Sequence, residues 1–380
     1  MTLKVYLIAG EPSGDLLGAR VMRALKKTDS QVQIFGVGGE SMQAEGLQSL
    51  FDIKDLAVMG LFEVLPKLPK ILKHFHEIQD HINQVKPDII MTIDAYSFSA
   101  RVHKMLKKNG CSVPHVHLVA PQVWAWNKNR AKKIGRFMDH LFCLLPNEPA
   151  YFEPHGMPTT FVGHPVIEGG ADKGDATSFR KNHAISSDKR ILCLLPGSRS
   201  NEIKYLLKDF MAVADNLYAT NPDLFIVIPT VETVRQKIES LTFDWKTPHI
   251  IVTGEKERYD AFAAASAAVA ASGTVSLELA MAHVPHLIAY KMNPITAALA
   301  RRVLKIKYVN LLNLLQDQAI IPELLQENCT VAKITATARD LLQGQISEET
   351  EPALIKLGLH SAESPSEKVA QYLIRLARNS

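Results

Sequence analysis

The sequence predicts two consecutive α/β domains, each built on a parallel sheet with helices on both faces. Short runs rich in Val, Ile and Leu alternate with longer helical patterns along most of the chain, which is typical of doubly wound folds. Several runs are apolar throughout, as strands buried on both faces are. The alternation stops at residues 163–175, which are rich in Gly, His, Pro and Asp, and then restarts. This stretch is therefore predicted to be an interdomain linker.

In the first half, strands are predicted at 4–9, 32–37, 89–93, 115–119, 140–145 and 160–162. A helix is predicted over 70–85, because apolar residues recur there on one helical face. Pro66 and Pro69 are expected to keep the preceding segment from forming a regular helix interior. The first predicted domain spans residues 1–165.

In the second half, strands are predicted at 191–195, 224–228, 249–252, 268–271 and 286–290. The helices between them are predicted at 204–218, 231–241, 259–266 and 275–282, and a final helix at 365–378 could belong to either domain. The second predicted domain spans residues 166–345, and a helical segment follows over 346–380.

Composition excludes several classes of protein. Among 380 residues, Lys and Arg number 43 and Asp and Glu number 39, giving a net charge of +4, which is too small to predict nucleic-acid binding. The four cysteines are far apart, so neither a disulfide framework nor a zinc site is expected. The longest uncharged stretch, 261–277, is too weakly apolar for a membrane span. We therefore expect a cytoplasmic protein that is at most peripheral to a membrane.

Candidate residues are sought where strands end, because doubly wound sheets bind ligands there. After the first strand, Ser13, Gly14 and Asp15 open a helix in a glycine-containing loop suited to close approach of an anion. The alternative is a plain turn in which Ser13 or Asp15 caps the helix. Asp94 ends an apolar strand, where a carboxylate is costly unless it is used. Asp94 is the candidate general base, and capping of the next helix is an equally good alternative.

Two loops of the second domain are suited to a phosphate-bearing ligand. In the first, Ser198 and Arg199 can bind a phosphate and stabilise a diphosphate leaving group. In the second, Ser272, Gly273 and Thr274 precede a helix that carries Glu278, whose carboxylate can accept hydrogen bonds from a ribose. The alternatives are a surface turn with an exposed arginine and a helix start with a solvated glutamate.

Two further segments could contact a membrane. An apolar ridge interleaved with lysines suits an anionic bilayer or an acyl chain, although a core-facing helix is the commoner explanation; its residues are Leu61, Leu65, Leu68 and Leu72. Basic residues that include Arg130 follow Trp124 and Trp126 and could meet lipid phosphates, or form a solvated helix face. Histidine pairs at 115/117 and 283/286 have no third ligand nearby in sequence, so no metal is expected.

Several motifs, in order along the whole chain, resemble those of the lipid-A-disaccharide synthase family. They are Gly10-Glu-Pro-Ser-Gly-Asp15, Val58-Met-Gly60, Pro121-Gln-Val-Trp-Ala-Trp126, Pro196-Gly-Ser-Arg-Ser-Asn-Glu-Ile203, Ala271-Ser-Gly-Thr274 with Glu278, and Tyr308-Val-Asn-Leu-Leu-Asn313. The resemblance implies a GT-B fold, in which two Rossmann-like domains face each other across a cleft. It also implies the inverting transfer of diacylglucosamine from UDP-2,3-diacylglucosamine to the 6-hydroxyl of lipid X, 2,3-diacylglucosamine 1-phosphate, with release of UDP.

By the same resemblance, Asp94 is the base, and no metal or other cofactor takes part. The residues implied to hold UDP are Ser198, Arg199, Ser272, Gly273, Thr274, Glu278 and Asn313. Those implied to contact substrate or shape its loops are Ser13, Gly14, Asp15, Trp124, Trp126, Arg130, Asn201 and Glu202. A homodimer, with C-terminal segments packed back or exchanged, and attachment to the inner membrane surface are also implied. The alternatives are a UDP-sugar epimerase of the same fold and a non-catalytic acyl-lipid or nucleotide-binding protein.

Overall fold

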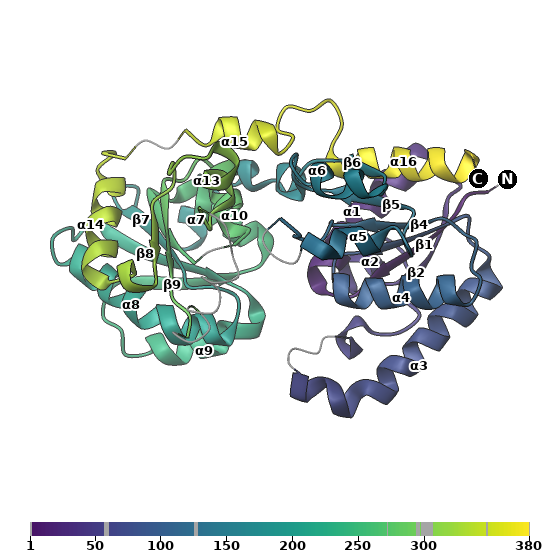
Figure 1. Ribbon diagram of the computed structural model, residues 1–380. Coiled ribbons are helices and arrows are strands. Elements are labelled where there is room, and N and C mark those ends of the chain that lie inside the picture. The colour runs from purple at the N-terminus through teal and green to yellow at the C-terminus, as the bar shows by residue number, and fades with distance from the viewer. Residues whose placement is uncertain are drawn as a thin grey trace. The chain divides into compact units, whose positions relative to one another are not determined.

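The computed structural model describes residues 2–56, 61–124, 128–271, 273–293, 297, 307–346 and 349–379; of residues 61–69, 128 and 379 it describes the backbone alone. The chain forms two compact units (Figure 1): unit 1 comprises Met1–Pro165 and His360–Ser380, and unit 2 comprises Val166–Leu359. Each unit contains a six-stranded sheet in which neighbouring strands are parallel. The predicted pair of doubly wound α/β domains is therefore confirmed.

The sheet of unit 1 has the strand order β2-β1-β3-β4-β5-β6. Its strands are β1 (Lys4–Ala9), β2 (Gln33–Val37), β3 (Ile89–Ile93), β4 (His115–Leu118), β5 (His140–Cys143) and β6 (Thr159–Phe161). Because β1 lies between β2 and β3, strand addition changes direction there. The loops after β1 and β3 thus meet at a topological switch point, where doubly wound folds bind ligands.

Alternating side chains of β1 face two different helical layers, as the two-residue period of a strand requires. Val5 and Leu7 pack with α1 (Pro12–Thr28), α2 (Glu40–Ala44) and α16 (Pro365–Asn379). Tyr6 and Ile8 pack with α3 (Leu61–Val85) and α4 (Tyr96–Lys108). The short helices α5 (Ala131–Ile134) and α6 (Pro149–Phe152) pack beside β5.

The final helix, α16, belongs to unit 1, although the chain reaches it after completing unit 2. It lies alongside α1 (Figure 1). Tyr372 of α16 stacks on His140 with ring centroids 4.2 Å apart, and its hydroxyl lies 2.8 Å from His140 Nδ1. Because α1 and β5 come from the first part of the chain, α16 covers a core that would otherwise be exposed.

The sheet of unit 2 has the order β12-β11-β10-β7-β8-β9. Its strands are β7 (Arg190–Leu195), β8 (Leu224–Thr230), β9 (His249–Thr253), β10 (Ala267–Ala270), β11 (His286–Tyr290) and β12 (Glu323–Leu325). Here β7 lies between β8 and β10, so the switch point lies at the carboxyl ends of β7 and β10.

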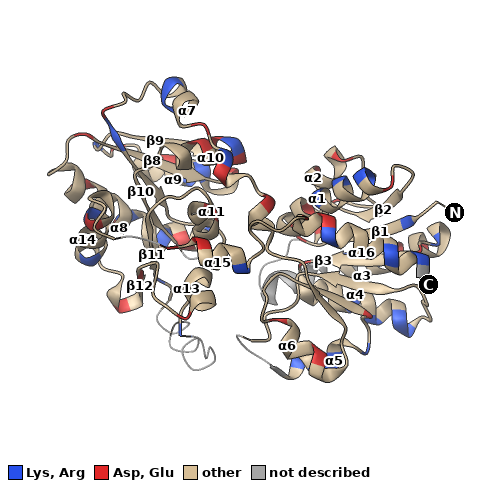
Figure 2. Ribbon diagram, turned by 90° about the horizontal axis from the view of Figure 1, so that it is seen from above, with Lys and Arg blue, Asp and Glu red and all other residues tan. Residues whose placement is uncertain are grey.

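Helices cover both faces of this sheet. One face packs against α8 (Ser200–Tyr218), α9 (Glu232–Thr242) and α14 (Val331–Leu342). The opposite face carries α10 (Glu255–Ala264), which Cys193 contacts through Ala261, and α10 packs in turn on α7 (Ala176–Asn182). Helix α15 (Glu351–Lys356) contacts α11 (Val275–Met281) and α13 (Leu311–Gln316). In both units, charged side chains lie mostly on helices and loops, and the strands carry few (Figure 2).

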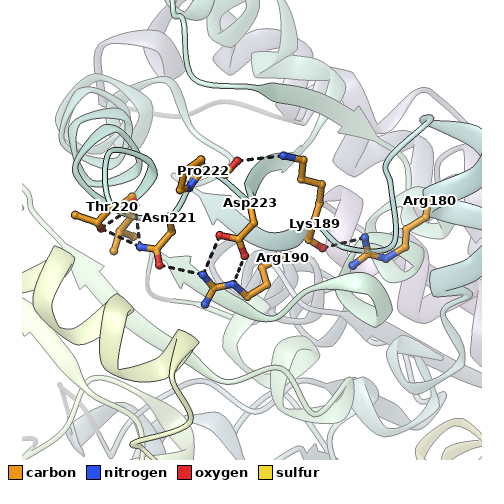
Figure 3. Close-up of polar contacts among 8 residues, drawn as sticks. Arg180, Lys189, Arg190, Thr220, Asn221, Pro222 and Asp223 are labelled. Atoms are coloured by element: carbon orange, nitrogen blue, oxygen red, sulfur yellow. Dashed lines mark hydrogen bonds and ion pairs between the residues drawn. The ribbon is translucent and has the colours of Figure 1, made fainter.

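At the amino ends of β7 and β8, polar contacts fix the pairing of the two strands (Figure 3). Arg190 donates through Nε and Nη2 to the two carboxylate oxygens of Asp223, at 2.6 and 3.1 Å, and through Nη2 to Asn221 at 3.0 Å. This two-pronged geometry is the favourable one for an arginine and a carboxylate. The pair holds the end of the sheet opposite the switch point, so its role is structural.

The structure differs from the sequence predictions in the start of one helix and in two elements that were not predicted. Helix α3 begins at Leu61 and passes through Pro66 and Pro69, whereas the sequence predicted a regular helix only from residue 70. Each proline removes one backbone hydrogen bond, but the second half of α3 is anchored by a buried apolar face, which offsets that loss. Strand β12 and helix α14 were not predicted at all. No described helix is long and apolar enough to cross a bilayer.

Candidate active site

Asp94 lies in a strained turn at the switch point of unit 1. It directly follows β3, and both Asp94 and Ala95 have left-handed backbone conformations, with φ of 55° and 43°. Such conformations are costly for residues other than glycine and gather at functional sites. The Asp94 amide donates to Leu118 at 2.9 Å, and the Ser99 hydroxyl donates to the Asp94 carbonyl at 2.8 Å. The side chain does not cap α4, so the capping alternative is wrong.

The glycine loop after β1 packs tightly against this turn. A Cβ atom on Gly14 would lie 2.8 Å from the carbonyl oxygen of Ile93, and one on Gly10 would lie 2.9 Å from Cβ of Ala95. The start of α1 can therefore approach β3 only because both residues are glycine. Ser13, between them, donates its hydroxyl to Asp94 Oδ2 at 2.6 Å. No described group donates to Oδ1, which remains available for a substrate hydroxyl.

Asp15, in contrast, faces away from Asp94. Its buried carboxylate, 4% exposed, accepts hydrogen bonds from the amides of Gly39, Ser41 and Met42 at 2.7, 2.8 and 3.0 Å. These contacts fix the loop that begins α2. The structure thus brings Ser13 and Gly14 close to Asp94, whereas the Asp15 carboxylate bonds backbone amides at the start of α2.

Buried histidines lie beneath the Asp94 turn. The Thr92 hydroxyl lies 2.8 Å from His103 Nε2 and 2.7 Å from His117 Nδ1, and the His103 ring lies 4.9 Å from that of His115. Burial lowers the pKa of His103 well below its usual value, and lowers the pKa of His115 and of His117 to about 4. The histidines are therefore neutral at physiological pH. Within the described ranges, no three His, Cys, Asp or Glu side chains are grouped so as to hold a metal ion.

A pocket of about 300 Å³ lies at the switch point of unit 2. It is bounded by residues at the carboxyl ends of β7, β8 and β10. Seven residues singled out from the sequence line it, namely Gly197, Ser198, Arg199, Glu202, Gly273, Thr274 and Glu278. Thr230 and Arg258 also line the pocket, and the sequence did not suggest them. The sheet therefore brings the loops after β7 and β10 together around one pocket.

Glu202 shapes the loop after β7. Its Oε2 accepts hydrogen bonds from the amides of Ser198 and Arg199 at 2.8 and 3.1 Å. Gly197 has a φ of 114°, and a Cβ atom there would collide with the Glu202 carboxylate, so the loop requires glycine. The Arg199 side chain is 66% exposed, with its guanidinium 3.5 Å from Glu202 Oε1. Arg199 can therefore turn toward an anion with little cost in lost contacts.

An ion pair between two mostly buried side chains lines the pocket. Arg258 donates to Glu278 Oε1 at 2.9 Å, and the Tyr259 hydroxyl donates to the same oxygen at 3.3 Å. Burial raises the pKa of Glu278, and the positive charge of Arg258 acts in the opposite direction. Thr230 Oγ1 and Arg258 Nε are buried without a hydrogen-bond partner among the described residues. Buried polar atoms are nearly always paired, and both residues line the pocket, so both atoms are free to bond a group that enters it.

The other predicted contact residues lie elsewhere or outside the described residues. Asn313 is buried, and its amide contacts Ile321 and Glu323 instead of the pocket. Asn201 is exposed in the first turn of α8, and Trp124 is half-buried. Ser272, Trp126 and the Val58–Gly60 motif lie outside the described residues, as do the side chains of Leu61, Leu65 and Leu68. Contact of these residues with substrate stays a prediction.

Comparison with known proteins decides the family. A family model described as lipid-A-disaccharide synthetase matches residues 5–375. The chain belongs to this family. It is 47% identical over 382 residues to the lipid-A-disaccharide synthase of Paramagnetospirillum magneticum, covering 98% of this chain and 97% of that one. It is 36% identical over 378 residues to the synthase of Shigella boydii serotype 18, covering 99% and 98%. The chain is thus a glycosyltransferase of lipid A disaccharide synthesis, as the sequence motifs implied.

Solved structures support the fold assignment. The UDP-GlcNAc 2-epimerase of Neisseria meningitidis, solved with UDP-GlcNAc bound, aligns with a TM-score of 0.65 at 12% identity, over 98% of this chain and 100% of that one. At this identity the likeness concerns the fold alone, which agrees with the predicted GT-B architecture. It does not favour the epimerase alternative, since the relatives with high sequence identity are synthases.

Proposed function

We propose that this enzyme transfers 2,3-diacylglucosamine from its UDP donor to the 6-hydroxyl of 2,3-diacylglucosamine 1-phosphate. The products are the β-1,6-linked disaccharide 1-phosphate and UDP. The observation that carries the proposal is that the two switch points bear complementary chemistry. Unit 1 presents a carboxylate with one unoccupied oxygen, and unit 2 presents a pocket with two arginines, hydroxyls and unpartnered polar atoms.

In unit 1, Asp94 acts as the general base. Its Oδ1 accepts the proton of the acceptor 6-hydroxyl while that oxygen bonds to the donor's anomeric carbon. Ser13 holds Oδ2 and thereby fixes the plane of the carboxylate. Attack from the face opposite the departing UDP inverts the anomeric configuration.

In unit 2, the pocket holds UDP as it leaves with the electrons of the broken anomeric bond. Arg199 and the Thr274 hydroxyl stabilise the developing charge on the diphosphate. Arg258 Nε and Thr230 gain the partners that they lack. Glu278 keeps Arg258 on one oxygen and offers the other to the ribose hydroxyls.

The direct test is incubation of the enzyme with the acylated UDP-glucosamine and the acylated glucosamine 1-phosphate. We expect UDP and a disaccharide monophosphate in equal amounts, with a β anomeric linkage by NMR. Omission of the acceptor should abolish UDP release. Conversion of the donor to a C2 epimer without acceptor would instead establish the epimerase alternative.

We further propose that α3 attaches the enzyme to the cytoplasmic face of the inner membrane. Leu72 on this helix is 48% exposed between Lys70 and Lys73, whose side chains are 54% and 74% exposed. An exposed leucine flanked by cations suits an anionic bilayer. Replacing Leu65, Leu68 and Leu72 with Ser should reduce sedimentation with anionic vesicles. Replacing the exposed Leu241, Phe243 and Ile355 of unit 2 is the control and should leave sedimentation unchanged.

The homodimer is also part of the proposal. Helix α16 covers unit 1 after the chain has left it for unit 2, an arrangement in which a second copy can supply the same helix. Light scattering should give twice the monomer mass. A monomer mass at all working concentrations would contradict the dimer.

A further inference from the structure

Besides the pocket of unit 2, a pocket of about 320 Å³ lies in unit 1, and the proposed chemistry does not use it. It is lined by residues of α4 and α5, by Asn129 and Arg130 before α5, and by Phe137 after it. Four cationic side chains line it and no acidic one does, namely Arg101, Lys104, Arg130 and Lys133. We call it the cationic pocket.

Aromatic rings hold two of these cations in place. The Arg130 guanidinium lies 5.0 Å from the centre of the Tyr96 ring, and Lys104 Nζ lies 4.8 Å from the centre of the Phe137 ring. Phe137 is buried, so the position of that ring is fixed by the core. Contacts of this kind orient a cation without neutralising it.

Three cations of the pocket form no ion pair with a described carboxylate. Among the described residues, Arg101, Lys104 and Lys133 form no ion pair, whereas Lys107 on the same helix pairs with Asp139 at 3.1 Å. Like charges gathered without an acid repel one another and raise the local positive potential. A bound dianion relieves this repulsion and can accept hydrogen bonds from lysine and from both prongs of arginine.

The cationic pocket begins where the Asp94 turn ends. Tyr96, which lines the pocket, is the first residue of α4 and stands two positions after Asp94. Arg101 and Lys104 follow on the same side of α4, with Arg101 about 7 Å further along the helix axis. Along the backbone, the Asp94 turn and the first lining residue of the cationic pocket are therefore near neighbours.

We propose that the cationic pocket binds the phosphate monoester of the acceptor, which places the acceptor's 6-hydroxyl at Asp94. This inference rests on the proposed function, because it assigns the acceptor's 1-phosphate to a site in the same unit as the base. The same phosphate chemistry is found in the headgroups of anionic phospholipids. The test therefore has to separate the acceptor from the membrane as the source of the phosphate.

The test variant is Arg101→Gln with Lys133→Gln. The matched control is Lys132→Gln with Arg136→Gln, which removes the same charge from exposed neighbours that do not line the pocket. In detergent micelles, the test variant should raise the acceptor KM about 30-fold, with the donor KM and the control variant unchanged. With unphosphorylated diacylglucosamine as acceptor, wild type and test variant should turn over equally slowly.

Two results would overturn the assignment. The first is an acceptor KM in the test variant equal to that of the control. The second is an unchanged acceptor KM in micelles combined with lost sedimentation on phosphatidylglycerol vesicles, which would assign the pocket to lipid headgroups. All the exchanged side chains are exposed, and matching thermal melts will show that every variant folds.

A failure of the proposed function can be told apart from a failure of this site. If wild type makes no disaccharide, calorimetric titration with glucosamine 1-phosphate and with glucosamine still shows whether the cationic pocket binds a phosphate monoester. Binding of the phosphate form to wild type and control, but not to the test variant, supports the site. Equal binding to all three proteins, or binding to none, overturns it.

Discussion

The two units share one architecture and differ in what they place at its switch point. In unit 1 the loop after β1 is pressed against the Asp94 turn through Gly10 and Gly14, and no room is left between them. In unit 2 the loops after β7 and β10 stay apart around a pocket of about 300 Å³, and a Cβ atom on Gly273 would meet nothing within 4 Å. One unit thus fixes a single carboxylate, and the other encloses an open pocket.

Under the proposed function, this difference gives the two units different tasks. Proton transfer requires a group fixed to within a fraction of an ångström, and tight glycine packing with the Ser13 hydrogen bond supplies that in unit 1. Binding of a nucleotide requires volume and several polar partners, which unit 2 supplies from three strand ends. Each prediction below concerns a property of one of the two units.

The largest effect is expected from Asp94→Asn. The amide cannot accept the proton of the acceptor, so kcat should fall about a thousandfold. Asp80→Asn, an exposed acid of unit 1 on α3, is the control and should keep wild-type kcat. Turnover within a factor of two of wild type in the Asp94 variant would show that Asp94 is not the general base.

The second prediction concerns acid stability. Burial lowers the pKa values of His115, His117, His140 and His164 of unit 1 to about 4. The unfolded chain binds these protons near pH 6.5 and the folded chain does not. Stability is therefore retained above pH 6.5 and lost as the pH falls toward 4, by about 2 kcal/mol per histidine at pH 5. Glu148, with a pKa raised by burial to about 7, acts in the opposite direction and offsets about one histidine.

Amide hydrogen exchange at pH 7 and pH 5 measures this in both units of the same sample. Peptides from β1, β3 and β4 should lose protection at pH 5 before those from β7, β8 and β10. In unit 2, burial raises the pKa of Glu278, which does not favour opening at low pH. Earlier loss of protection in unit 2 would contradict the prediction.

Asp15→Asn should affect stability more than catalysis. The substitution weakens three backbone hydrogen bonds to a buried carboxylate, at a cost of about 2 kcal/mol in the free energy of unfolding. Urea denaturation measures that cost, and kcat of the folded variant should stay within about threefold of wild type. A loss in kcat comparable to that of Asp94→Asn, with stability unchanged, would indicate that Asp15 takes part in the reaction.

The smallest effect is expected from Thr230→Val in unit 2. The change removes a buried hydroxyl that has no partner among the described residues, so the melting temperature should stay the same or rise. The affinity for UDP should fall about fivefold, because one hydrogen bond to the ligand is lost. Thr335→Val removes another such hydroxyl, on α14 away from the pocket, and should leave UDP binding unchanged. Equal UDP affinities in the Thr230 and Thr335 variants would show that Thr230 does not bond UDP.

Sequence reasoning succeeded where one local pattern carries the information. The apolar runs predicted most strands to within about two residues, and Gly197, Arg199 and Gly273 were found because each lies in a loop directly after a strand. Arg258 and Thr230 were missed because their place in the pocket depends on how α10 and β8 pack beside the loops after β7 and β10. The conformation at Asp94 was also unpredictable, since the strain is maintained by Gly10 and Gly14, about 80 residues away.

The most direct test of the division between the units is calorimetric UDP binding to Asp94→Asn and Arg199→Gln, measured side by side. We predict that Asp94→Asn binds UDP with a Kd within about twofold of wild type, although it does not turn over. Arg199→Gln should weaken UDP binding about tenfold, because it removes a charge-assisted contact to the diphosphate. Equal weakening of UDP binding in both variants would contradict the account, since it would make Asp94 part of the nucleotide site.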